Sequence, residues 1–243
     1  MNTRYRSTST TRQSLIATNR SGGSAPFQPP MRPHRVLPST IAKRRKIVQM
    51  AMRHFAEKGY EGARMEDLAV RVGISKASIF QHFGSKQALF MKAYKQAVTS
   101  LPTWLDVPPE VKEKGFFAIL RYWLEHTQEY ARRDSVAVRL AILGAYGVEL
   151  PLQREVNRFT NAEDPSGRLE FVKFGIERGE VRDDIDTSLL VSVLAWMGAR
   201  FQDAELTEEI DSGVFREADG TPKMTERRVD QFMEMVQGAI GKR

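Results

Sequence analysis

The chain has 243 residues, 41% of them hydrophobic, which is enough for one large domain or for a small domain followed by a mid-sized one. It contains no cysteine and its four histidines are scattered, which excludes a disulfide framework and a thiolate metal site. No segment approaches the roughly 18 consecutive apolar residues of a membrane span, and the N-terminus lacks the apolar stretch of a secretory signal. We therefore expect a cytoplasmic protein without a metal or another cofactor.

The net charge of +7 is distributed unevenly along the chain. Residues 1–56 contain 11 lysines and arginines and no acidic residue, whereas the remainder contains 26 basic and 30 acidic residues. Such an asymmetry is typical of a protein that binds the phosphate backbone of nucleic acid with one part of its surface. A basic tail that only improves solubility is the alternative, and composition alone does not separate the two.

Residues 1–38 form the first predicted segment, rich in serine, threonine, arginine, proline and glycine. Too few apolar side chains are present to offset the entropy of ordering, so we expect a disordered basic arm. The composition also resembles an organellar transit peptide, although the rest of the chain argues against that destination. Translation from Met31 is a further alternative that the sequence leaves open.

From Ser39 onward, apolar residues recur at the 3.6-residue spacing of an amphipathic helix, up to Gly59, which is suited to end it. A short helix is expected over residues 65–72. Ser75 and Ser85 are predicted to cap two more helices, the first running to Phe83. Further amphipathic helices are expected over residues 110–132, 135–147, 151–160, 165–179, 186–204 and 223–240. Strand signals are absent, so the fold class is all-α.

The stretch from Leu68 to Lys86 contains two short helices around Gly73, which is a helix-turn-helix arrangement. One set of residues on the second helix is expected to project outward, where it suits phosphates, base edges and thymine methyl groups. This set comprises Lys76, Ala77, Ser78, Phe80, Gln81 and His82. The remaining candidates for DNA contact, at the start of that helix or among the flanking basic residues, are Ser75, Lys43, Arg44, Arg64 and Lys86.

These motifs resemble those of the TetR family of bacterial transcription regulators, over residues 40 to about 90. The matching segments are Phe55-Ala56-Glu57-Lys58-Gly59-Tyr60, Leu68-Ala69, Gly73-Ile74-Ser75-Lys76, His82-Phe83 and Ser85-Lys86. The resemblance implies an N-terminal three-helix helix-turn-helix domain, here residues 39–84. It also implies a larger helical effector-binding and dimerisation domain, here residues 85–243, and the function of a DNA-binding regulator.

Three positions depart from the family's pattern. Phe80 stands where the family usually has tyrosine, which removes a phenolic hydroxyl that could contact the backbone of DNA. Arg64 follows Ala63 where a threonine or serine is common, so a hydroxyl cap of the next helix is lost and the guanidinium becomes available to phosphate. His54 replaces a residue that is usually apolar.

The segment 186–204 carries too wide an apolar stripe for a helix that is covered on one side, and residues 223–240 offer apolar residues at a matching spacing. We therefore expect the last two helices to form a homodimer seam, in agreement with the resemblance. The expected interface residues are Leu190, Leu194, Ala195, Met197, Gly198, Phe201, Phe232, Met233 and Val236. Burial within one monomer is the alternative.

A small apolar or aromatic effector is expected from the resemblance and from the aromatic residues between positions 110 and 180. The expected ligand-binding residues are Phe116, Leu120, Trp123, His126, Tyr146, Phe159 and Phe174. The same residues would serve equally well as a dry core.

Motifs for an enzyme are missing, since the sequence has no Walker loop, nucleophile elbow, dinucleotide turn or paired metal ligands. The sequence thus predicts a sequence-specific regulator, a repressor that an effector releases from a palindromic operator in double-stranded DNA. The alternative is a nucleoid-binding or architectural protein of the same fold that responds to no ligand.

Overall fold

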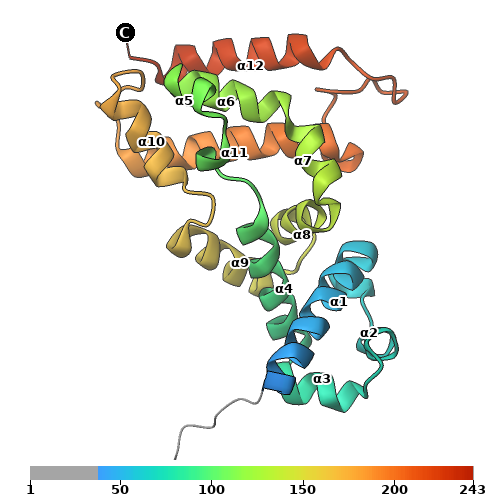
Figure 1. Cartoon of the computed structure of the whole chain (residues 1–243). Coiled ribbons are helices and arrows are strands. Elements are labelled where there is room, and N and C mark those ends of the chain that lie inside the picture. Colours follow the sequence, from blue (N-terminus) through green and yellow to red (C-terminus); the bar gives the residue numbers. More distant parts are fainter. Residues whose placement is uncertain (1–37, 243) are drawn as a thin grey trace, which may run out of the picture. The chain divides into compact units, whose positions relative to one another are not determined.

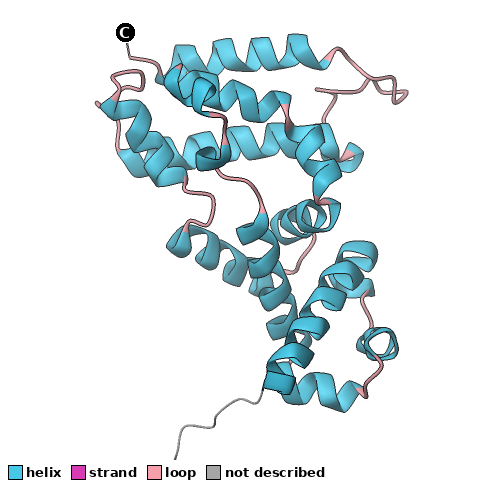
Figure 2. Cartoon of the chain, viewed as in Figure 1, coloured by secondary structure: helices cyan, strands magenta, loops and turns pink. Residues whose placement is uncertain are grey.

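The computed structural model describes residues 38–242, and these residues form helices joined by loops and turns (Figure 2). Within this range the only strand-like pairings are two isolated bridges, Val181 with Gly241 and Arg216 with Pro222. The all-α fold class is confirmed. The predicted basic arm lies outside the described residues, except for Pro38, where the first helix begins.

Twelve α-helices and two 3-10 turns follow one another in the described part of the chain (Figure 1). They are α1 (Pro38–Gly62), α2 (Met65–Val72), α3 (Lys76–Phe83), α4 (Lys86–Ser100), η1 (Trp104–Asp106), α5 (Pro109–Glu113), α6 (Phe116–Glu125), α7 (Thr127–Arg133), α8 (Ser135–Tyr146), α9 (Leu150–Glu163), α10 (Arg168–Glu177), α11 (Thr187–Leu206), η2 (Glu208–Ile210) and α12 (Thr225–Ile240).

One predicted helix, over residues 110–132, is corrected by the structure, which divides it into α5, α6 and α7. The first break is at Gly115, whose φ of +99° lies outside the helical region. The second is at His126, where φ is −102° and ψ is 8°. Gly59 behaves as expected, since its φ of +70° interrupts α1, although a last turn continues to Gly62.

The first apolar core joins the three N-terminal helices to α4, α8 and α9. Its fully buried members include Phe55 of α1, Leu68 of α2, Phe90 of α4 and Leu140 of α8. Each amphipathic helix buries its apolar stripe here, which is the main source of stability for helices as short as α2 and α3. The core spans residues on both sides of the boundary expected at residues 84 and 85, which stays a prediction.

A second apolar core lies between α6, α10, α11 and α12. Phe116 is fully buried there and stacks on Phe171 of α10, with ring centroids 4.3 Å apart. Glu180 closes one end of this core. Its carboxylate accepts a hydrogen bond from the Phe116 N–H at 2.9 Å and so caps α6, for which Gly115 can offer no side chain.

No helix of residues 38–242 is by itself long and apolar enough to cross a membrane. One bent pair, Ser135–Tyr146 with Leu150–Glu177, passes that test by length and composition alone.

Candidate nucleic-acid interface and ligand cavity

The turn between α2 and α3 is built by local residue chemistry. Gly73 adopts a left-handed conformation, with φ of +79°, and its N–H closes the end of α2 on the Ala69 and Val70 carbonyls. The Ser75 hydroxyl then accepts a hydrogen bond from the Ser78 N–H at 3.1 Å and caps α3. Ser85 caps α4 in the same way, through the Ala88 N–H. Both predicted serine caps are confirmed.

Packing against the first core decides which face of α3 is free. Ile79 is buried, and Phe83 packs against the same core. Lys76, Ala77 and Gln81 are exposed, whereas the side chains of Ser78, Phe80 and His82 are half-buried; these positions complete the predicted contact set on α3. Phe80 therefore projects less than expected, because its ring packs on the core and lies 5.8 Å from the Lys76 ammonium.

Lys76 is also paired within the protein. Its ammonium lies 2.6 Å from the Glu66 carboxylate of α2, and both side chains are about half exposed. An exposed ion pair is worth about 0–1 kcal/mol, so a group on DNA could replace Glu66 as the partner of Lys76 at small cost. This contact could not be predicted from the sequence, because it depends on how α2 and α3 cross.

The start of α1 lies beside the end of α3, which brings three predicted DNA-contact residues together. The Arg44 guanidinium lies 4.9 Å from the Phe83 ring centroid. Burial lowers the pKa of His82, and the charges of Lys43 and Arg44 lower it further. Lys43 and Arg44 thus form a cationic cluster beside His82 and next to the exposed face of α3.

Of the two remaining basic candidates, one side chain is free to contact DNA and the other is bonded within the protein. Arg64 is exposed at the start of α2 and offers that helix no side-chain cap, as expected. Its carbonyl oxygen lies 3.0 Å from Nε2 of His54, which explains a polar residue in the core. Lys86 is engaged inside the protein, since its ammonium donates to the Glu61 carbonyl at 3.2 Å and lies over the Tyr60 ring.

A cavity of about 390 Å³ lies among α4, α6, α7, α8 and α11 and the loop before α10. Of the residues predicted to bind a ligand, Leu120 and Trp123 line it. The residues from α11 in its wall include Leu194, Ala195 and Gly198, which were expected at a dimer seam. Its walls are mostly apolar, and its volume falls within the range of small-molecule sites.

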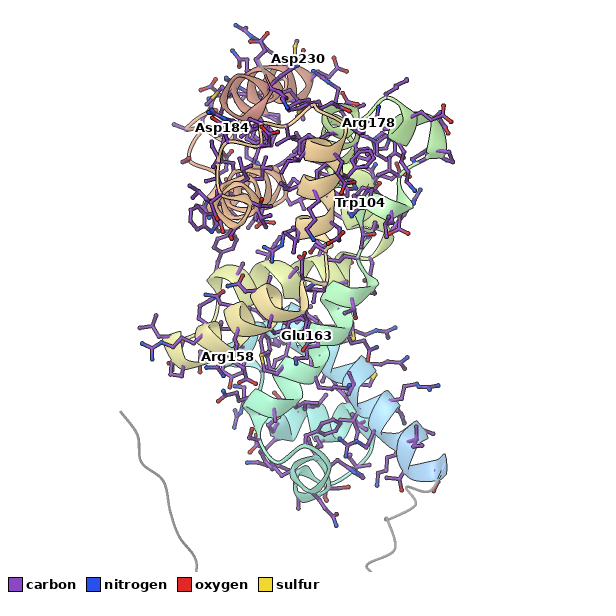
Figure 3. The ribbon with its side chains drawn as sticks, turned by 90° about the vertical axis from the view of Figure 1, so that its left-hand side faces the viewer. Trp104, Arg158, Glu163, Arg178, Asp184 and Asp230 are labelled. Carbon is purple, nitrogen blue, oxygen red and sulfur yellow. The ribbon has the colours of Figure 1, made fainter. Side chains whose placement is uncertain are left out.

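The other five predicted ligand residues do not line the cavity. Phe116 is enclosed in the second core and Phe159 in the first. His126 stacks on Tyr122, and its Nδ1 lies 2.8 Å from that residue's carbonyl oxygen. Phe174 packs against Trp104, which Figure 3 labels beside α10. Tyr146 is 42% exposed and its hydroxyl donates to Asp203.

Apart from Leu194, Ala195 and Gly198, which line the cavity, the expected seam residues divide into two groups. Leu190, Met233 and Val236 are each at most 5% exposed within one chain, so they have no surface left for a partner. Phe201 and Phe232 stack on each other at 4.3 Å, and Met197 packs against the same core. Large apolar side chains that do remain exposed on α11 and α12 are Leu189 at 51%, Trp196 at 67% and Met235 at 66%. Periodicity could not separate burial within a monomer from burial between monomers.

Comparison with known proteins agrees with this arrangement. Residues 47–93 match the family model described as bacterial regulatory proteins of the tetR family. The chain is 25% identical over 200 residues to the HTH-type transcriptional repressor AcnR of Corynebacterium glutamicum, covering 82% of this chain and 93% of that protein. It is 42% identical over 50 residues to the biofilm operon negative regulator IcaR of Staphylococcus aureus, covering 21% of this chain and 27% of that protein.

Solved structures share the fold at low sequence identity. A TetR-family transcriptional regulator from Chloroflexus aurantiacus has a TM-score of 0.53 and 20% identity, covering 85% of this chain and 96% of that one. A TetR-family protein from Vibrio parahaemolyticus has a TM-score of 0.57 and 16% identity, covering 83% of this chain and all of the other.

Proposed function

Since the chain belongs to the TetR family of bacterial regulatory proteins, we propose that it is a transcriptional repressor that binds operator DNA as a homodimer and is released by a small molecule. The observation that carries the proposal is the exposed face of α3, held by the Gly73 turn and the Ser75 cap beside a cationic cluster. A recognition helix requires such a face, with base-reading side chains and flanking phosphate contacts.

In this proposal Lys76, Ala77 and Gln81 face the bases, while Lys43, Arg44 and Arg64 contact phosphates. Two subunits related by a two-fold axis would read a palindrome whose half-sites are about one helical turn apart. The exposed apolar residues support the dimer, because Leu189 and Trp196 lie two turns apart on one face of α11, and an exposed apolar patch marks an interaction site.

A row of packed aromatic rings supports coupling between the cavity and the DNA-binding helices. Tyr94 lines the cavity and stacks on Phe90 of the same helix, 6.2 Å away. Phe90 in turn contacts the rings of Phe55 and Tyr60 in α1, at 5.2 and 5.1 Å. Gly144 of α8 lies so close to Tyr94 that no side chain fits between them. A ligand that moves Tyr94 would therefore move α4, and it shifts DNA affinity only if it binds the two conformations unequally.

Replacing one reading residue and one phosphate-contacting residue should give different signatures. Gln81→Ala should weaken operator binding by roughly 5- to 150-fold, since a bidentate contact to adenine discriminates by about 1–3 kcal/mol, and should leave binding to random duplex unchanged. Arg44→Ala should weaken both and lower the slope of log affinity against log salt by about 0.9 per subunit. Fluorescence anisotropy at several salt concentrations measures these effects.

Gln96→Ala, at an exposed position on α4, is the matched control and should behave as wild type. If Gln81→Ala weakened operator and random duplex equally, α3 would not read sequence.

DNA binding should strengthen as the pH falls. In the free protein, burial and the charges of Lys43 and Arg44 lower the pKa of His82. A phosphate next to this cluster would offset those charges and raise the pKa, so complex formation takes up a proton. Affinity therefore rises as the pH falls through the pKa of the complex, by up to about tenfold per pH unit and subunit, and levels off below the pKa of the free protein.

His82→Gln should remove most of this pH dependence between about pH 8 and pH 5.5, a range that spans the usual histidine pKa. His126→Gln is the control, because His126 lies on another helix and contacts the Tyr122 carbonyl oxygen. This variant should retain the pH dependence. An equal pH dependence in all three proteins would place His82 away from phosphate.

A further inference from the structure

Two charged residues line the cavity, Arg168 and Asp203. The two differ in how fully other protein groups pair with their charge. The Arg168 guanidinium donates to the Asp164 carboxylate at 3.0 Å and to the Thr160 carbonyl at 2.9 Å. Its charge is thus paired within the wall, so Arg168 attracts an anionic ligand only weakly.

Asp203 lacks a comparable partner among residues 38–242. One carboxylate oxygen, Oδ2, accepts a hydrogen bond from the Tyr146 hydroxyl at 2.9 Å, and no described cation pairs with either oxygen. Within the described part of the chain, the one cation that acts on its charge is Arg200, whose guanidinium lies over the Tyr146 ring, 5.0 Å from the ring centroid. Burial raises the pKa of Asp203, although the Tyr146 hydrogen bond and the charge of Arg200 oppose that rise. A carboxylate held in this way favours a cationic partner.

The other lining residues indicate the chemistry of the rest of the ligand. Tyr94, Trp123, Tyr130 and Phe171 supply aromatic surface, and such rings attract an organic cation as well as an apolar body. The wall next to Asp203 is formed by three small residues of α11, which occupy little of the cavity. They are Ala195, Gly198 and Ala199. Thr127 and Gln202 bond to each other at 3.0 Å and add no charge.

We propose, as an inference that rests on the proposed effector function, that the cavity selects an amphipathic amine. Such a ligand has an apolar or aromatic body and one ammonium group that pairs with Asp203. A carboxylate ligand would meet a like charge at this wall. A neutral alcohol could donate one hydrogen bond to Asp203 without neutralising it, and such bonds are about half as strong as ion-assisted ones.

Calorimetric titration with three matched probes tests this inference: naphthylethylamine, naphthylethanol and naphthylacetate. On the wild-type protein the amine should bind about tenfold or more tightly than the alcohol, and the carboxylate most weakly. In Asp203→Asn the affinity for the amine should fall to that for the alcohol, whose own affinity stays within about twofold. Glu170→Gln removes a carboxylate from the exposed surface of α10 and should leave the order unchanged.

An alcohol that binds the wild type as tightly as the amine overturns the inference, and this comparison holds even if Asp203→Asn fails to fold. So does an amine preference that survives in a folded Asp203→Asn variant. If all three probes bind alike and release operator DNA, the effector function stands and only the amine is refuted. If none binds while DNA binding persists, the effector cavity and the inference both fail.

Discussion

Trp196→Asp should separate the subunits and weaken operator binding by about 100-fold or more. Trp196 is 67% exposed on α11, and Leu189, two helical turns earlier on the same face, is 51% exposed. A charge at the centre of such a face should oppose association, because it would be buried without a partner. Joining two recognition helices in one dimer multiplies affinity by about 10²–10⁴, and a monomer loses that factor. Sedimentation velocity and anisotropy with operator DNA measure the two effects.

Leu150→Asp is the matched control, since Leu150 is 73% exposed on α9. It should remain dimeric and bind operator DNA like the wild type. A Trp196→Asp monomer that kept full affinity, or a Trp196→Asp protein that stayed dimeric, would contradict the proposed seam. Ala195 and Gly198 are poorer positions for this test because both line the cavity, where a charge would also disturb the ligand site.

Gly115→Ala should lower the free energy of unfolding by about 3 kcal/mol. The backbone of Gly115, with φ of +99° and ψ of −167°, lies in a region that is essentially restricted to glycine and costs another residue roughly 1–3 kcal/mol. An added Cβ would also collide with the Glu180 carboxylate, which caps α6 through the Phe116 N–H. Losing a helix cap costs about 1 kcal/mol more. In a chain of this size the melting temperature should fall by roughly 6–12 °C.

Gly179→Ala separates the two causes, since Gly179 also has a positive φ, +71°, but no atom lies near its missing Cβ. Its loss should be limited to the conformational cost, roughly 1–2 kcal/mol. Chemical denaturation of both variants gives the comparison. Equal losses in the two would show that Glu180 moves freely and does not seal the second core.

The helix-turn-helix was predictable because short-range signals specify it. Gly73 is needed for the left-handed turn, and Ser75 and Ser85 cap the helices that follow. These effects act within four residues, so a single sequence contains them. The break inside residues 110–132 had such a signal in Gly115, but the second break at His126 had none.

The contacts of individual site residues could not be predicted, because they depend on how distant segments pack. The sequence predicts Lys86 to be a phosphate contact, but its ammonium donates a hydrogen bond to the Glu61 carbonyl. Phe116 and Trp123 lie on one helix, yet the first is sealed in the second core and the second lines the cavity. Asp203 was missed since one carboxylate at the end of a helix is ordinarily solvated. Its position within an apolar helix was the available signal.

Selection of bound sequences from a pool of random DNA duplexes should show whether the protein recognises a specific palindrome. We expect enrichment of two inverted half-sites whose centres are about 10 base pairs apart, and loss of that enrichment with Gln81→Ala. A bound pool that matches the input in base composition and shows no repeated motif would mean that the protein reads no sequence, and would favour an architectural protein of the same fold.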